Sequence, residues 1–299
     1  MAGYLSLAAK LVLNVHDLNN EGSVGQSLDI RQIRMVDESG TALEEMPAVS
    51  GRMMKHWHLE HCRKRALDSG MPLCTTCKAG QPDRQTAATD ELAAIQECAV
   101  CDTHGFLSTK KMTNAPRRSS CASFSWLLPV LGTKPESKQV IHYRVATGTE
   151  ASAGGDETAQ MIFHKSYASG LFAFIASIDL NRIGKTVDNR NVIGDVALRK
   201  KLVVQAILPL CLGSFGASQS HALPHTRCVG LLAALSTTHK PVPNLISPIY
   251  PKGFDESIAL LNAMGKDVSW WTYGVSSEAA KDKTKDTVQG VIDEILKGI

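Results

Sequence analysis

The sequence predicts an α+β fold, with a sheet of the ferredoxin-like or RNA-recognition type that carries insertions. The first observation is alternation over residues 5–15, where apolar residues occupy every second position and mostly polar ones lie between them. This is the pattern of a strand with one buried face. The second is element order, because a strand-rich stretch followed by a helix occurs twice, the helices falling at residues 51–67 and 202–212.

Composition limits the class of protein. The chain has 299 residues, of which 43% are hydrophobic and 20% charged, so it can bury a substantial core as a folded globular protein. The net charge of +3 is too small to identify a polyanionic partner. No secretion signal opens the sequence, and we expect a cytoplasmic protein with reduced thiols. The apolar run 202–212 is too short to span a bilayer, so no membrane is expected as a partner.

The remaining elements are predicted from local signals. Ser50 is the expected N-cap of the first helix, Gly265 should end a helix over 256–264, and Val288, Ile292 and Ile295 form the buried stripe of a C-terminal helix. Further strands are predicted at residues 30–36, 120–130, 171–178 and 228–235. Short strands at 140–146 and 161–164, joined by small and polar residues 147–156, predict a hairpin over 140–164.

A cysteine-rich insert covers residues 70–105 within a single domain, 1–299. Cys74-x-x-Cys77 and Cys98-x-x-Cys101 have the arrangement of two knuckles that share one tetrahedral zinc ion. Four cysteines leave no open coordination position, so the zinc is expected to be structural. The alternative is four unpaired thiols. Four further donors could replace one cysteine, namely His58, His61, Cys62 and His104.

Several segments have the residue types that bind a nucleic-acid backbone. The helix start Ser50-Gly51-Arg52, with Lys55 one turn later, offers amides and cations to a phosphate, although an ordinary capped helix is an equally good interpretation. The other candidates are Arg117, Arg118 and Ser120 after the insert, with Lys110 and Lys111 before them, and His164 and Lys165 after the predicted hairpin.

No catalytic motif is present in the sequence. There is neither a Gly-x-Ser-x-Gly elbow nor a phosphate-binding Gly-x-x-x-x-Gly-Lys. Asp17 and Asp29 flank the polar loop 17–25 and could hold a metal for RNA cleavage, but such aspartates are more often turn formers. The sequence therefore predicts a protein that is not an enzyme.

Taken in order, these segments resemble a known family. The matching segments are residues 14–19, 21–25, 47–51, 70–77, 161–164 and 167–170. They resemble the DevR-like backbone subunits of type I CRISPR Cascade, most closely those of subtype I-A. The resemblance implies an RNA-recognition-like palm, an inserted zinc-knuckle module as fingers and a thumb hairpin. Its implied RNA-facing residues are Asn19, Ser23, Ser50, Gly51, Arg52 and His164.

The resemblance also implies a function. Backbone subunits oligomerise as a helical filament along CRISPR RNA, hold its sugar-phosphate chain, and present the guide for pairing with target DNA beside other Cascade subunits. Two alternatives remain, a CRISPR RNA-processing endoribonuclease of the same superfamily and a zinc-containing nucleic-acid-binding regulator. The first would require a histidine-based acid-base site and a glycine-rich loop near the C-terminus, and the last quarter of the sequence has no such loop.

Overall fold

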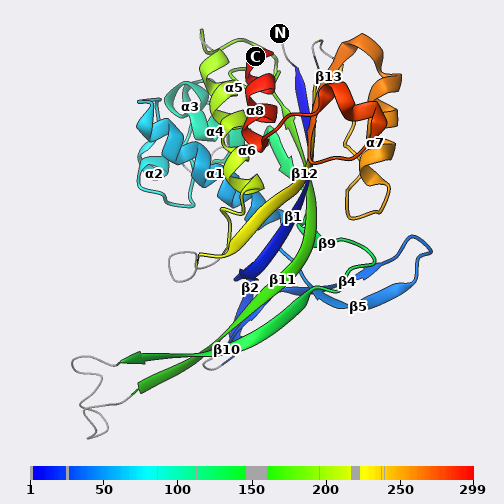
Figure 1. The fold of residues 1–299 in the computed structure, drawn as a ribbon. Helices are drawn as coiled ribbons and strands as arrows, with labels where there is room; N and C mark the ends of the chain where they lie inside the picture. The colour runs from blue at the N-terminus through cyan, green and yellow to red at the C-terminus, as the bar shows by residue number, and fades with distance from the viewer. Residues whose placement is uncertain are drawn as a thin grey trace, which may run out of the picture.

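The computed structural model describes residues 3–24, 27–85, 87–111, 114–145, 160–194, 196–216, 223–236, 238 and 240–299. Figure 1 shows a long twisted sheet with helices packed on both sides of one end and a narrow hairpin at the other end. Helices and strands are mixed along the chain, so the α+β prediction is confirmed. Within the described ranges, no helix combines the length and the apolar character needed to cross a membrane.

The main sheet is built around two long strands. Its order is β13-β12-β1-β11-β3-β2, and β8, β9 and β10 also pair with β11. The strands are β1 (Tyr4–His16), β2 (Asn20–Val24), β3 (Ser27–Ile30), β8 (Ala122–Phe124), β9 (Leu128–Pro129), β10 (Glu136–Val145), β11 (Gln160–Asp179), β12 (His225–Ser236) and β13 (Val268–Tyr273). β1 lies between β11 and β12 and is antiparallel to both.

The core lies on both faces of this sheet. The alternating leucines of β1 are at most 1% exposed and pack against α1 (Gly51–Asp68), α5 (Val196–Gln205), α6 (Ile207–Cys211) and α8 (Val288–Lys297) as one cluster. On the opposite face, Ala8, Leu232 and Trp270 pack beneath α7 (Gly253–Ala263). Figure 1 shows α7 on the other side of the sheet from α1, α5 and α8.

The predicted helix ends agree well with the structure, with one difference. Ser50 caps α1, and its hydroxyl accepts a hydrogen bond from Met53 N at 3.2 Å. α7 ends just before Gly265, which has a φ of 66°. The predicted helix at 202–212 is two helices, because Pro209 lacks the N–H that would continue the α-helical ladder from α5 into α6.

Other elements differ more from expectation. The predicted strands 161–164 and 171–178 are parts of one strand, β11, which has 20 residues. The predicted strand 120–130 is wrong in its continuity, since it is divided into β8 and β9 around a β-bridge between Leu127 and Val49. Part of the predicted loop 17–25 forms β2, and β13 was not predicted.

Two additional units project from the sheet. The hairpin of β4 (Gln32–Val36) and β5 (Ala42–Pro47) forms a separate two-stranded sheet. The cysteine-rich segment forms short elements beside α1. They are α2 (Thr75–Lys78), α3 (Glu91–Glu97), α4 (Ala99–His104), β6 (Phe106–Leu107) and β7 (Arg117–Arg118). The 3-10 helices η2 (Gly265–Asp267) and η3 (Glu278–Lys283) follow α7 and β13 respectively.

Candidate nucleic-acid interface and cysteine cluster

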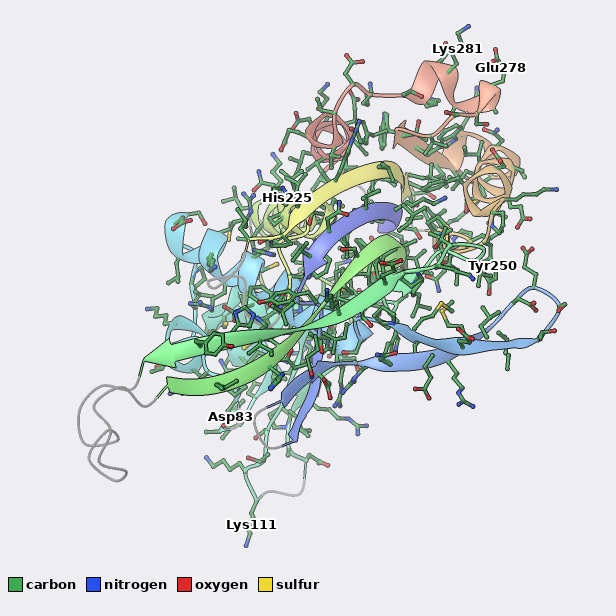
Figure 2. The ribbon with its side chains drawn as sticks, turned by 60° about the horizontal axis from the view of Figure 1, so that its bottom comes forward. Asp83, Lys111, His225, Tyr250, Glu278 and Lys281 are labelled. Carbon is green, nitrogen blue, oxygen red and sulfur yellow. The ribbon has the colours of Figure 1, made fainter. Side chains whose placement is uncertain are left out.

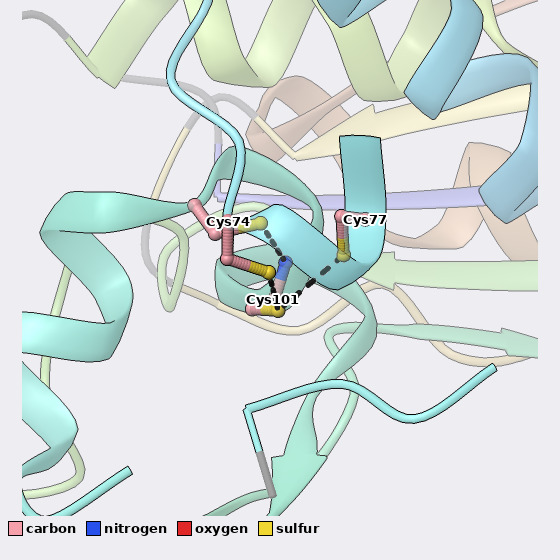
Figure 3. Close-up of side chains that lie close together, drawn as sticks. Cys74, Cys77 and Cys101 are labelled. Atoms are coloured by element: carbon pink, nitrogen blue, oxygen red, sulfur yellow. Dashed lines mark hydrogen bonds between the residues drawn. The ribbon is translucent and has the colours of Figure 1, made fainter. Parts of the chain in front are cut away.

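The two cysteine knuckles meet in one buried cluster. Cys74 is the N-cap of α2 and Cys98 the N-cap of α4, so each helix start presents its own pair of thiols. The Cys101 Sγ atom lies 3.8 Å from Cys74 Sγ and 3.7 Å from Cys77 Sγ, contacts that Figure 3 marks with dashed lines. All four sulfur atoms lie within 4.8 Å of one another, and all four residues are buried.

This geometry fits a tetrahedral zinc ion. With Zn–S bonds of about 2.3 Å, two sulfur ligands of a tetrahedral site are separated by about 3.8 Å. A disulfide would need about 2.05 Å between sulfur atoms, and none of these cysteines forms one. Four thiolates in a buried space repel one another unless a cation lies between them. The donor set is therefore suited to a structural zinc ion.

The four additional donors do not join this cluster. His58, Cys62 and His104 form a separate buried group, and the His61 ring donates from Nε2 to the Ser214 carbonyl at 2.7 Å. Burial lowers the pKa of His61, and it lowers the pKa of His58 to about 4. The alternative of a histidine replacing a cysteine is thus not favoured by the geometry.

A buried ionic network joins the cysteine module to the rest of the protein. The Asp102 carboxylate, in α4, accepts hydrogen bonds from Arg118 at 2.6 Å, Arg199 at 3.0 Å and the Gly184 amide at 2.9 Å. Burial raises the pKa of Asp102, and the two guanidinium groups oppose this effect. These contacts connect α4 to α5 and to the segment after β11.

This network overturns the predicted RNA contact of Arg118. Arg118 is 5% exposed, and its three guanidinium nitrogens donate to Glu91, Asp102 and the carbonyls of Asp102, Arg182 and Lys185. A guanidinium has five N–H donors, and this side chain has none left for a phosphate. Ser120 is half-buried, and its hydroxyl donates to the Ala122 carbonyl at 2.8 Å. The Ser120 hydroxyl thus stabilises its own loop, and its RNA contact stays a prediction.

The N-terminus of α1 brings several predicted residues together. The Asn19 side-chain oxygen accepts from the Ser50 hydroxyl at 3.0 Å and from the Ser50 amide at 3.3 Å. Gly51 has no room for a side chain, because a Cβ atom there would lie 2.5 Å from the Phe124 carbonyl oxygen. The turn after β1 and the start of α1 are thereby held together. The first N–H groups of a helix have no intrahelical acceptors and favour an anion.

Cations surround this helix start. Arg52 is exposed and Lys55 is half-buried. Burial lowers the pKa of Lys55, and the nearby Arg84 and Arg52 guanidinium groups lower it further. Neither Arg84 nor Arg31 was predicted from the sequence. The Arg31 amide donates to the Asn19 carbonyl at 2.7 Å, and the Arg31 guanidinium lies 5.8 Å from the centre of the Trp126 ring. The exposed Trp126, between β8 and β9, was the sequence signal that could have pointed to Arg31.

The base of the β10–β11 hairpin adjoins the same turn. His164 is half-buried in β11 and pairs with Ser27 of β3 and Ile141 of β10. Lys165 is only 4% exposed, and its ammonium lies 3.6 Å from the Asp17 carboxylate and 5.3 Å from the centre of the Tyr167 ring. The prediction of an exposed phosphate-binding lysine is therefore wrong for Lys165, which neutralises a buried carboxylate.

The turn after β1 has a fixed geometry. Val15 and Leu18 have φ values of 54° and 43°, which are uncommon for residues with a side chain. Leu18 N donates to His16 Nδ1 at 2.9 Å, so this ring carries its proton on Nε2, which faces the Gly213 carbonyl at 3.4 Å. The ring also stacks on Phe215. Such strain persists only where surrounding contacts enforce it.

The remaining predicted residues are less connected. Asp29 accepts from Gln139 and Ser166, each at 3.2 Å, and so fastens β3 to the hairpin. Ser23 lies in β2 opposite Leu28, and residues 147–156 lie outside the described residues. Arg117 is exposed in β7. Lys110 and Lys111 are exposed too, and Figure 2 shows Lys111 on a loop that projects from the body.

Comparison with known proteins identifies the family. Residues 7–257 match the family model described as "CRISPR-associated negative auto-regulator DevR/Csa2". The chain belongs to this family. The resemblance inferred from the sequence motifs is confirmed.

The DevR/Csa2 assignment agrees with curated relatives. A protein of Methanocaldococcus jannaschii named "CRISPR-associated protein Cas7/Cst2/DevR" is 25% identical over 98% of this chain and all of its own length. A protein of the same name from Thermoproteus tenax is 29% identical over 98% of this chain and 95% of its own. A solved structure titled "CRISPR RNA-guided surveillance complex" contains a chain with a TM-score of 0.56 at 13% identity, covering 98% of both chains, which shows a shared fold.

Proposed function

We propose that this chain is a non-catalytic backbone subunit of a type I CRISPR Cascade that binds CRISPR RNA along its sugar-phosphate chain. The observation that carries the proposal is the cationic helix start of α1. There Asn19, Ser50 and Arg52 are brought together, with Lys55 one turn along and Arg31 beside them. Amides and cations bind phosphate without reading bases. Such a site would leave the guide free to pair with target DNA.

The interface extends from this helix start to the projecting hairpin. β3 pairs with β2 on one side and with β11 at His164 on the other, so His164 belongs to the same part of the sheet as the turn containing Asn19. We propose Asn19, Ser23, Ser50, Gly51, Arg52, Lys55 and His164 as the RNA-contacting set, with Arg31 added. Arg117 is exposed but lies on the cysteine module, and we assign it an outer phosphate contact.

The absence of catalysis is supported by how candidate groups are occupied. Asp17 lies beside the Lys165 ammonium, and Asp29 accepts hydrogen bonds from Gln139 and Ser166. His16 uses both ring nitrogens in contacts with Leu18 and Gly213. His16 also lies 3.3 Å from the Asp17 carboxylate, but both side chains are buried, whereas a general acid-base pair must reach its substrate. The proposal therefore favours RNA binding over processing.

The parts of the molecule would have distinct roles. The main sheet with its helices would be an RNA-recognition-like palm within one domain, residues 1–299. The cysteine-rich segment 70–105 would be a zinc-stabilised finger, and residues 140–164 a thumb. The partners would be CRISPR RNA, target DNA through the guide, further copies of the chain in a helical filament and other Cascade subunits. The assembly would be cytoplasmic.

A binding experiment tests the proposal. Full-length protein is titrated onto fluorescent single-stranded RNAs of unrelated sequence at several salt concentrations. Similar affinities with strong salt dependence are expected, because the contacts are to phosphate. The double variant Arg52→Ala/Lys55→Ala should bind all the RNAs about tenfold more weakly, as expected for the loss of roughly 1.4 kcal/mol.

The matched control removes two cations elsewhere. Lys252→Ala/Lys281→Ala changes the net charge equally, and Figure 2 shows Lys281 at the opposite end of the molecule from the β10–β11 hairpin. Equal weakening by both double variants would show that only net charge matters. RNA cleavage abolished by a single histidine substitution would favour the processing nuclease, and preference for one duplex DNA sequence would favour a regulator.

A further inference from the structure

A second cluster of metal-binding side chains lies outside the four cysteines. His58 and Cys62 are four residues apart on α1, which places them on one face of the helix. His104 is the last residue of α4 and meets them from the cysteine module. All three residues are buried, and their ligand atoms lie within 4.8 Å of one another.

The distances approach those of a metal site. His58 Nδ1 lies 3.1 Å from His104 Nε2 and 3.9 Å from Cys62 Sγ. With metal–nitrogen bonds of about 2.05 Å and a metal–sulfur bond of about 2.3 Å, tetrahedral geometry separates two nitrogens by about 3.3 Å and nitrogen from sulfur by about 3.5 Å. Shifts of a few tenths of an ångström at these two pairs would bring both to these values.

Hydrogen bonding fixes the orientation of the first ligand. A carbonyl oxygen only accepts, so His58 Nε2 must donate to Val203 O, 3.0 Å away. The lone pair of His58 is therefore on Nδ1, the atom that faces His104 and Cys62. A histidine that binds a metal through one nitrogen usually donates from the other to a carbonyl or carboxylate in this way.

Without an ion, His104 Nε2 donates to His58 Nδ1, and Cys62 makes only the long contact to His58. An ion held by these three atoms would replace both contacts. His104 Nδ1 is buried without a hydrogen-bond partner among the described residues in either state, so the ligand geometry alone carries the inference.

We propose that His58, Cys62 and His104 hold a second metal ion, a soft closed-shell ion bound by one thiolate and two imidazoles. Zinc would take a small fourth ligand such as water, and monovalent copper would need none. The ion would fasten α1, which carries the cationic helix start, to α4 of the cysteine module. This inference does not depend on the RNA-binding proposal.

Metal content of the full-length protein tests the site. Protein loaded with zinc under reducing conditions and then desalted should contain two ions per chain, one for each cluster. Cys62→Ala should contain one. The control Cys228→Ala, which removes a buried cysteine from β12, should still contain two. A parallel loading with monovalent copper distinguishes the two ions.

A measurement on the unaltered protein avoids dependence on folding of the variant. X-ray absorption at the zinc edge should find nitrogen or oxygen ligands as well as sulfur, in the ratio of three light atoms (two imidazole nitrogens and one water oxygen) to five sulfurs for both sites together. One zinc ion per chain with sulfur ligands alone, and the same copper content in the unaltered protein and in Cys62→Ala after copper loading, would overturn the proposal. That result would leave the four-cysteine site and the RNA-binding proposal intact.

Discussion

Arg118, near the cysteine cluster, and Arg52, at the start of α1, have the same side chain in opposite environments. The Arg118 side chain is 1% exposed and is paired with Glu91 and with Asp102, whose own side chain is 0% exposed. Arg52 is exposed, beside a half-buried lysine. The cysteine module thus uses its charges internally to hold its position, whereas the helix start directs them outward. Positive charge in a sequence identifies a binding surface only after the buried carboxylates are known.

Removing one of the four clustered cysteines, the proposed zinc ligands, should produce the largest effect in this comparison. In Cys77→Ser the cluster loses a thiolate, and structural zinc is worth about 10–16 kcal/mol in small zinc-binding peptides. Because a domain is stable by only about 5–15 kcal/mol, the module should unfold. Thermal unfolding and zinc content measure the effect, with Cys228→Ser, a buried thiol outside both clusters, as the control. If Cys77→Ser and Cys228→Ser have the same melting temperature and the same zinc content, the four-cysteine cluster does not bind a structural zinc ion.

Breaking the ionic network should have the next largest effect. Asp102→Asn leaves Arg118 and Arg199 buried with a neutral partner, and losing one member of a buried ion pair costs about 3–5 kcal/mol. The melting temperature should fall by about 10 °C. Asp188→Asn is the control, because its ion pair with Arg190 is exposed to solvent and contributes little to stability. A similar small shift in both variants would contradict the structural role.

Substitution of Arg31 tests the outward-facing region. Arg31→Ala should weaken RNA binding several-fold and reduce the salt-dependence slope by about 0.7, the value for one phosphate contact on a single strand. The melting temperature should change little. Arg34→Ala removes an exposed arginine of β4, paired with Glu45, and should leave affinity nearly unchanged. If Arg34→Ala weakens binding as much, the interface extends along the β4–β5 hairpin instead.

Two helix caps provide the smallest and sharpest contrast. Ser50 caps α1 and Thr287 caps α8, each through its side-chain oxygen, so alanine at either position should cost about 1 kcal/mol of folding stability. Only Ser50→Ala should also weaken RNA binding, because Ser50 holds Asn19 at the proposed interface. Thermal melts and RNA titrations on both variants measure this. Weaker binding by Thr287→Ala as well would point to a loss of folded protein.

Local patterns predicted much of the fold. The alternation in β1, the Ser50 cap and the Gly265 stop depend on the residues themselves, and the structure has them where expected. The knuckle spacing correctly grouped Cys74, Cys77, Cys98 and Cys101. The prediction divided β11 into two strands, because Ser166, Ser169 and Gly170 interrupt its apolar pattern. In the structure, pairing with five other strands stabilises it as one continuous strand.

The candidate site was less predictable. Whether a basic residue faces solvent depends on contacts distant in sequence, and neither the Asp102–Arg118 nor the Asp17–Lys165 pair has a local pattern. Arg31 and Arg84 were missed for the same reason. The sequence motifs at Asn19 and Ser50 were informative because both residues act through backbone geometry at a turn and a helix start.

The continuity of β11 links the core to the periphery. At about 3.3 Å per residue, the 20 residues of β11 have a contour length of about 65 Å. One end is anchored between β1 and β8, and the other carries the hairpin with β10. Because one strand runs through both parts, a bend of the hairpin relative to the core must be taken up by the backbone of β11 itself. If neighbouring copies meet through this hairpin, the length of a single strand sets the spacing at which they repeat.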